Sequence, residues 1–106
     1  MIADITPPQL AEKLRGPNPP LLIDVREPFE HAYCLIAGAQ LRPLGQIAFW
    51  AKTLDPEAET ILYCHVGERS ALATAYLQNL GFKRVLNLVG GIDAWAALVD
   101  PNVPRY

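Results

Sequence analysis

The chain has 106 residues, of which 51% are hydrophobic, a length and composition that suit one compact domain with a buried core. Its formal net charge is −2 and its nine basic residues are scattered, which argues against a nucleic-acid surface. The sequence contains no apolar run of about 18 residues that would indicate a membrane-spanning helix. Because the first residues lack a secretory-signal pattern and the two cysteines lack metal-binding spacing, we expect a cytoplasmic protein that binds no metal. We also expect one domain over residues 1–106, monomeric and with neither a nucleic-acid nor a membrane partner.

Turn-forming residues divide the chain into alternating strands and helices. After an extended start at Ile2–Ile5, Thr6 is a helix-capping residue, and the helix that follows it ends at Gly16. The apolar run Leu21–Val25 has the length of a strand that is buried on both faces. The remaining predicted elements are a helical turn at Pro28–Tyr33, a strand at Ala39–Leu41, a helix at Leu44–Leu54, a strand at Thr60–Cys64, a helix at Ser70–Leu80, a strand and turn at Arg84–Gly91, and a last helix at Ile92–Leu98.

This alternation predicts an α/β fold with a mainly parallel sheet and helices on both of its faces. Ligands bind such sheets beyond the carboxyl ends of the strands. Cys64 is the last residue of one predicted strand, and Asp24 and Arg26 lie at the end of another. We therefore expect Cys64 at the functional edge of the sheet. At the same edge, we expect Asp24 and Arg26 to hold the loops in place through an ion pair or hydrogen bonds.

The segment CHVGERS, residues 64–70, is the strongest candidate for a reactive site. A loop this short must turn tightly, and Gly67 supplies the backbone freedom to do so. Backbone N–H groups that turn inward, the positive end of the following helix and the charge of Arg69 would each favour a thiolate at Cys64 over a thiol. This pattern predicts that Cys64 is a nucleophile. The alternative is that Cys64 serves only as a small apolar residue of the core. A P-loop is excluded because the sequence has no GK[ST].

Three segments in this order resemble the rhodanese-type sulfurtransferases. CHVGERS resembles the family's active-site loop, C-x-x-G-x-R-S; LLIDVREPFEHAYCLIAGA resembles its first signature; and GFKRVLNLVGGIDAW resembles its closing signature. The resemblance implies a rhodanese-like α/β fold around a mainly parallel five-stranded sheet. It also implies that Cys64 is the catalytic residue and that the substrate-binding loop consists of His65, Val66, Gly67, Glu68, Arg69 and Ser70.

The reaction that the resemblance implies is sulfur transfer in two steps, with neither a metal nor an organic cofactor. The Cys64 thiolate would take a sulfur atom from a donor such as thiosulfate or a persulfide. It would then pass that atom to cyanide or another thiophilic acceptor, including a protein thiol. Phosphatase and arsenate-reductase relatives carry C-x5-R, whereas only four residues separate Cys64 from Arg69 here, which fits sulfur transfer. The alternative is a docking or sulfur-relay module of the same fold that does not turn over.

Two departures from the family pattern affect the site. The family's G-H-I-P-G-A reads CLIAGA at residues 34–39, so its Gly, His and Pro are replaced. The loop carries acidic Glu68, and it has His65 where an arginine is common. Because fewer positive charges should bind the thiosulfate dianion less well, we expect weak activity with thiosulfate. We expect a persulfide on a small thiol or a partner protein to be the true donor.

Several other residues have simpler interpretations. Trp50 and Trp95 stand at helical spacing from other apolar residues and are predicted to lie in the core. Cys34 is interpreted as an incidental cysteine, with a resolving thiol for Cys64 as the alternative. His31 is expected at the surface. His65 is expected either to tune the thiolate or to be a solvated loop residue.

Overall fold

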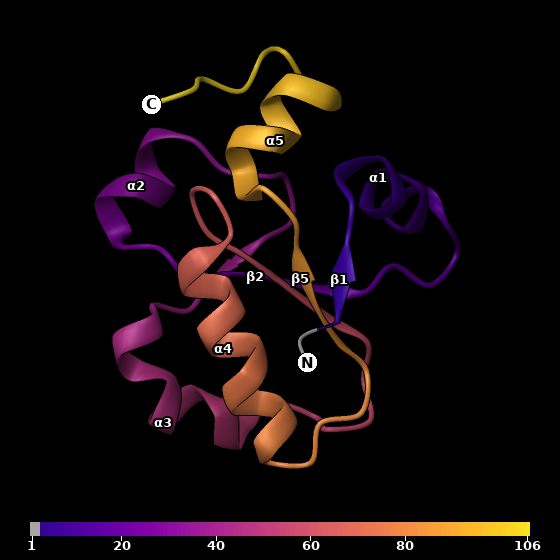
Figure 1. Cartoon of the computed structure of the whole chain (residues 1–106), viewed down its shortest axis with the longest axis vertical. Coiled ribbons are helices and arrows are strands. Elements are labelled where there is room, and N and C mark those ends of the chain that lie inside the picture. Colours follow the sequence, from indigo (N-terminus) through magenta and orange to yellow (C-terminus); the bar gives the residue numbers. More distant parts are fainter. Residues whose placement is uncertain (1–2) are drawn as a thin grey trace.

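The computed structural model describes residues 3–106, in which five strands form one sheet (Figure 1). The strands are β1 (Asp4–Ile5), β2 (Leu21–Asp24), β3 (Gln40–Leu41), β4 (Thr60–Tyr63) and β5 (Val85–Leu88). Their order across the sheet is β1-β5-β4-β2-β3, and all four pairings are parallel. The predicted α/β fold with a five-stranded parallel sheet is confirmed. The N-terminal extended segment is confirmed only as β1, since Ile2 lies outside the described residues.

Helices cover both faces of this sheet. Within residues 3–106 they are α1 (Pro7–Arg15), α2 (Pro28–Tyr33), α3 (Ile47–Trp50), α4 (Glu68–Asn79) and α5 (Gly91–Leu98). One buried cluster joins α1 and α5 to the sheet through Leu10, Ile92 and Trp95, and a second joins α3 and α4 to it through Trp50 and Leu77. Both tryptophans therefore belong to the core, as predicted. The last residues of the chain lie beside α2 (Figure 1), where the ring of Tyr106 contacts that of Tyr33.

The segment expected as a helix over Leu44–Leu54 is helical from Leu44 to Thr53, but it is not one regular α-helix. A single α-helical turn, α3, lies between two 3₁₀ turns at Leu44–Gln46 and Ala51–Thr53. The indole Nε1 of Trp50 donates to the carbonyl oxygen of Pro43 at 2.8 Å, and the Thr53 hydroxyl donates to the carbonyl oxygen of Trp50 at 2.8 Å. Both side chains bond to backbone carbonyl oxygens of this segment and hold its short helical turns in place.

The helix after Cys64 begins at Glu68, two residues earlier than expected. Gly67 is its N-cap and has a φ of 103°, a left-handed conformation that side-chain-bearing residues rarely adopt. Its turn lets the helix begin at once, so Arg69 and Ser70 lie in the first turn of α4 rather than in the loop before it. The positive end of α4 is therefore closer to Cys64 than the predicted boundary implied.

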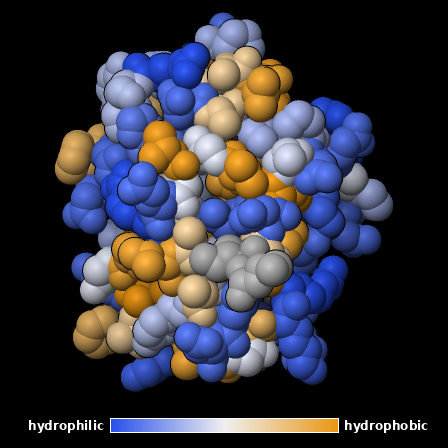
Figure 2. Space-filling model, viewed as in Figure 1, coloured by the Kyte–Doolittle hydropathy of each residue, from blue (hydrophilic) through white to orange (hydrophobic). Residues whose placement is uncertain are grey.

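The molecular surface mixes polar and apolar residues. On the face seen in Figure 2, hydrophobic residues form small separate patches among hydrophilic ones. In the part of the chain that the structure describes, no helix is both long enough and apolar enough to cross a membrane.

Candidate active site

Cys64 follows β4 directly at the carboxyl edge of the sheet, and only 1% of its surface is exposed. Its main chain is held by the first turn of α5: the N–H of Ile92 donates to the carbonyl oxygen of Cys64 at 2.9 Å, and the N–H of Asp93 donates to that of His65 at 3.0 Å. Gly91 has a φ of 60° and lies so close that a β-carbon there would come within 3.0 Å of these carbonyl oxygens. The turn at Gly91 is therefore a structural part of the Cys64 site, consistent with a role in backbone geometry.

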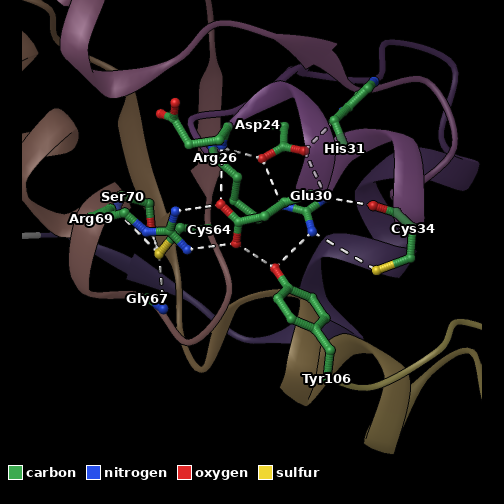
Figure 3. Close-up of polar contacts among 11 residues, drawn as sticks. Asp24, Arg26, Glu30, His31, Cys34, Cys64, Gly67, Arg69, Ser70 and Tyr106 are labelled. Carbon is green, nitrogen blue, oxygen red and sulfur yellow. Dashed lines mark hydrogen bonds and ion pairs between the residues drawn. The ribbon is translucent and has the colours of Figure 1, made fainter.

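Backbone N–H groups surround the sulfur atom (Figure 3). The N–H of Gly67 donates to Cys64 Sγ at 3.1 Å, and the N–H of Ser70 donates to it at 3.4 Å. Both come from the first turn of α4 or its cap. The Sγ atom thus occupies the position where a helix N-terminus binds anions, and this arrangement stabilises negative charge on sulfur.

The hydroxyl group of Ser70 is shared between two neighbours. Its Oγ lies 3.4 Å from Cys64 Sγ but only 2.6 Å from Asn87 Oδ1. Since a hydroxyl has one proton, the short contact identifies Asn87 as the acceptor. Asn87 Nδ2 in turn donates to the carbonyl oxygen of Gly67 at 3.3 Å. Asn87 therefore links both ends of the turn that holds the sulfur. It was not among the predicted site residues, although one polar residue inside the apolar strand VLNLV is a signal that could have identified it.

Arg69 lies at the predicted position, but its charge is already paired. Its Nη1 and Nη2 atoms donate to the two carboxylate oxygens of Glu30 at 2.7 and 3.0 Å. This bidentate contact lowers the pKa of Glu30 to about 2 despite partial burial, and it raises the pKa of Arg69. Arg69 thus stands at the start of α4, and its charge is paired with that of Glu30 from α2.

The remaining residues of the predicted loop make no hydrogen bond to the sulfur within residues 3–106. Val66 and Glu68 are exposed, and neither makes a side-chain hydrogen bond to Cys64 among the described residues. His65 is half-buried, and its Nε2 atom is buried without a hydrogen-bond partner. The interpretation of His65 as a solvated loop residue is therefore wrong.

A second ion pair lies beside the first and is fully buried. Nε and Nη2 of Arg26 donate to the two carboxylate oxygens of Asp24 at 2.9 and 2.7 Å, which confirms the expected pair. Burial alone would lower the pKa of Arg26, but hydrogen bonds to Asp24 and Tyr106 raise it overall, so the guanidinium stays charged. His31 Nδ1 donates to Asp24 at 2.8 Å, and its side chain is 22% exposed. The expectation of a surface histidine is corrected, because a buried carboxylate needs this donor.

Tyr106 joins the two ion pairs. Its hydroxyl accepts from Arg26 Nη1 at 2.9 Å and donates to Glu30 Oε2 at 2.7 Å (Figure 3). Its ring stacks on His65, with centroids 3.9 Å apart and planes inclined by 10°. Burial raises the pKa of Tyr106 to about 12, so the phenol keeps its proton at neutral pH. We call Asp24, Arg26, Glu30, Arg69 and Tyr106 the ion-pair network. The sequence carried no local signal for Tyr106, because 76 residues separate it from Glu30.

Cys34 contacts Arg26 of the ion-pair network. Its carbonyl oxygen accepts from Arg26 Nη2, and its Sγ lies 3.8 Å from Arg26 Nη1. Both cysteines are free thiols, and Figure 3 places Arg26 and Glu30 between them. This arrangement favours the interpretation of Cys34 as an incidental cysteine over its interpretation as a resolving thiol for Cys64. In the described part of the chain, no three or more His, Cys, Asp or Glu side chains group as metal ligands would.

Comparison with known proteins agrees with this fold. A model of the rhodanese-like domain family matches residues 6–98, and the chain belongs to that family. It is 38% identical over 96 residues to a "Sulfurtransferase" of Allochromatium vinosum, covering 91% of this chain and 90% of that protein. It is 39% identical over 112 residues to "Rhodanese-like/PpiC domain-containing protein 12, chloroplastic" of Arabidopsis thaliana, covering 99% of this chain but only 38% of that relative. A rhodanese-like domain protein from Staphylococcus aureus superposes with a TM-score of 0.85 at 28% identity, covering 99% of each chain.

Proposed function

We propose that this chain is a sulfurtransferase in which Cys64 carries sulfane sulfur as a persulfide. The observation that supports this most directly is the position of Cys64 Sγ, which receives two backbone N–H groups at the start of α4. The same donors stabilise either a thiolate or the terminal sulfur of a persulfide. Membership of the rhodanese-like family and similarity to a protein named as a sulfurtransferase support the same reaction class.

Each half-reaction conserves atoms and charge. In the first, the Cys64 thiolate attacks the outer sulfur of thiosulfate; the S–S bond of the donor breaks, a Cys64 S–S bond forms, and sulfite leaves with the bonding electrons. In the second, cyanide attacks the terminal sulfur of the persulfide, a C–S bond forms, and Cys64 leaves as thiolate. Neither step requires an external oxidant or reductant. A persulfide donor follows the same first step, with its thiolate as the leaving group.

Thiosulfate is the weaker donor in this proposal. The guanidinium of Arg69 is paired with Glu30, and Glu68 adds a carboxylate to the loop. A dianion would therefore meet little uncompensated positive charge at the site. We propose that a persulfide on a small thiol or a protein cysteine is the physiological donor, in the reducing cytoplasm that keeps both cysteines free.

The test is intact-mass measurement of reduced protein after brief exposure to thiosulfate and, separately, to a small-thiol persulfide. The wild type should gain one sulfur atom. Cys64→Ser should gain none, Cys34→Ser should behave like the wild type, and cyanide should remove the added sulfur as thiocyanate. Gain of sulfur by Cys64→Ser but not by Cys34→Ser would contradict the assignment of Cys64.

A docking or sulfur-relay module is the second candidate. Only 1% of the Cys64 surface is exposed, which suits a docking module, since docking needs no donor at this residue. In a docking module, neither thiosulfate nor a persulfide donor would change the mass of the wild type. A relay module would gain the sulfur atom without turning over, so repeated formation of thiocyanate with excess donor and cyanide separates the enzyme from the relay.

A further inference from the structure

An aromatic hollow lies next to the Cys64 site, and the transfer of sulfur itself does not use it. Phe29, Glu30, Tyr33 and Tyr106 line this hollow, whose volume is about 370 Å³. Phe29 and Tyr33 come from α2 and are 74% and 59% exposed, although aromatic side chains usually bury most of their surface. Tyr33 and Tyr106 meet edge to face, with centroids 5.8 Å apart, so together they form an ordered aromatic wall. We call this hollow the aromatic recess.

Two residues that line the aromatic recess contact residues of the Cys64 turn. Glu30 holds both Nη atoms of Arg69, five residues after Cys64 in the same turn. Tyr106 stacks on His65, the neighbour of Cys64. Figure 3 shows Arg69, Glu30 and Tyr106 joined by hydrogen bonds beside Cys64. The recess therefore adjoins the Cys64 turn on its α2 side.

The charges around the recess favour an uncharged occupant. No cationic side chain lines it, and its one carboxylate, Glu30, is already satisfied by Arg69 and the Tyr106 hydroxyl. A dianion would gain nothing there. An aromatic or apolar group would remove the exposed rings of Phe29 and Tyr33 from water and pack against them.

We propose that the aromatic recess binds an aromatic or apolar group attached to the sulfane sulfur of the donor. This inference rests on the proposed sulfurtransferase function and gives its donor a chemical class: sulfur carried on an organic group with an apolar body. The donor then gains its affinity from the recess, and the loop needs no unpaired positive charge to bind it. Binding by the recess would let the site select a donor even though the charge of Arg69 is neutralised by Glu30.

The probe is benzenethiosulfonate, compared with methanethiosulfonate. In both, the Cys64 thiolate attacks the terminal sulfur, the S–S bond of the donor breaks, the Cys64 persulfide forms, and the sulfinate leaves with the electron pair. The two donors carry the same charge and the same reacting group, and they differ in the phenyl ring. Their rates with a free dithiol give the intrinsic difference in reactivity, by which the enzyme ratio is divided.

The wild type should prefer benzenethiosulfonate about tenfold in kcat/KM after this correction, since burial of part of a ring on aromatic side chains has that order of effect. Phe29→Ala and Tyr33→Ala should each bring the ratio close to one. Phe49→Ala is the matched control, because Phe49 is 76% exposed and lines a separate hollow with Arg42, Gln46 and Thr53. It should keep the wild-type ratio.

A corrected ratio near one in the wild type would overturn the inference, as would a ratio that Phe49→Ala abolishes and Phe29→Ala preserves. A binding measurement tests the recess without turnover. By calorimetry, Cys64→Ser should bind benzenesulfinate more tightly than methanesulfinate. Adding Phe29→Ala to Cys64→Ser should remove this difference in affinity. If no donor forms a persulfide but this binding difference is found, the proposed function fails and the recess stands. If persulfides form with no difference in corrected kcat/KM between the two donors, the recess proposal fails and the proposed function stands.

Discussion

Two neighbouring regions at the carboxyl edge of the sheet, the Cys64 turn (residues 64–70) and the ion-pair network, handle charge in different ways. In the Cys64 turn, the sulfur is contacted by neutral backbone N–H groups of Gly67 and Ser70. In the network, every carboxylate is matched by a guanidinium in a bidentate contact. Arg69 belongs to both regions, yet its charge is directed to Glu30.

The difference shows how a site can stabilise an anionic sulfur without a free cation beside it. Backbone dipoles at the start of α4 are fixed by the fold and need no reorganisation when charge develops. The side-chain charges nearby cancel in pairs and hold the turn in position from the α2 side. Removing charge should therefore destabilise the network, whereas displacing the backbone should disable the Cys64 turn. Three substitutions test this division.

Asp24→Asn should have the largest effect on stability. It leaves the Arg26 guanidinium buried without its counter-charge, which should lower the free energy of unfolding by about 3–5 kcal/mol. Denaturant unfolding followed by tryptophan fluorescence measures this. Glu12→Gln is the control, because it removes the same charge from the exposed pair with Arg15 and should cost about 0–1 kcal/mol. Equal effects of the two substitutions would show that the network is not stabilised by its buried charges.

Gly91→Ala should have the next largest effect, and it should act on the Cys64 turn. A methyl group at a φ of 60°, within 3.0 Å of the Cys64 and His65 carbonyl oxygens, must displace the main chain that carries the nucleophile. We expect a loss of about 2–3 kcal/mol in stability. Persulfide formation, followed by stopped-flow mixing with a sulfur donor, should slow by more than the loss of folded protein explains.

Gly45→Ala provides the comparison for that substitution. Gly45 has no atom within 4 Å of the added methyl position, and its φ is not positive. It should keep both the stability and the persulfide rate. If Gly91→Ala also kept the wild-type rate, the position of the Cys64 backbone would not control the reaction, and the contrast between the two regions would fail.

Glu30→Gln should have the smallest effect on stability, because Arg69 is partly exposed and water can replace the lost contact. At neutral pH we expect a cost of about 1–2 kcal/mol. The pKa of Glu30 is about 2 in the folded protein and 4.5 ordinarily, so the unfolded chain binds this proton more readily. The contribution of Glu30 is therefore complete above about pH 4.5 and is lost as the pH falls toward 2.

Unfolding measured from pH 7 to pH 2 should accordingly show the wild type and Glu30→Gln converging at the acid end. The variant also releases Arg69, so its kcat/KM for thiosulfate should rise relative to the wild type. A constant stability difference at all pH values would contradict the pairing of a charged Glu30 with Arg69. An unchanged thiosulfate activity would contradict the view that this pairing disfavours the dianion.

The sequence by itself determined the alternation of strands and helices, the strand that ends at Cys64 and the residues of the Cys64 turn. These features depend on neighbours a few positions apart: an apolar run of strand length, a glycine able to turn, and a helix that follows. For the same reason it predicted the pair of Asp24 and Arg26, which lie two residues apart. Local spacing carries that information because the backbone limits where nearby side chains can go.

Only the tertiary structure decided what surrounds these residues. Glu30 meets Arg69 across 39 residues, Tyr106 meets Glu30 across 76, and Asn87 meets Ser70 across 17. Such contacts depend on the order of strands in the sheet and on the path of the last residues over α2, which no local pattern encodes. The segment predicted as a helix at Leu44–Leu54 is helical from Leu44 to Thr53, but its changes between 3₁₀ and α geometry had no signal in the local pattern. Whether Arg69 offers its charge to a ligand or to Glu30 was thus a question of which side chain the fold brings within hydrogen-bond distance.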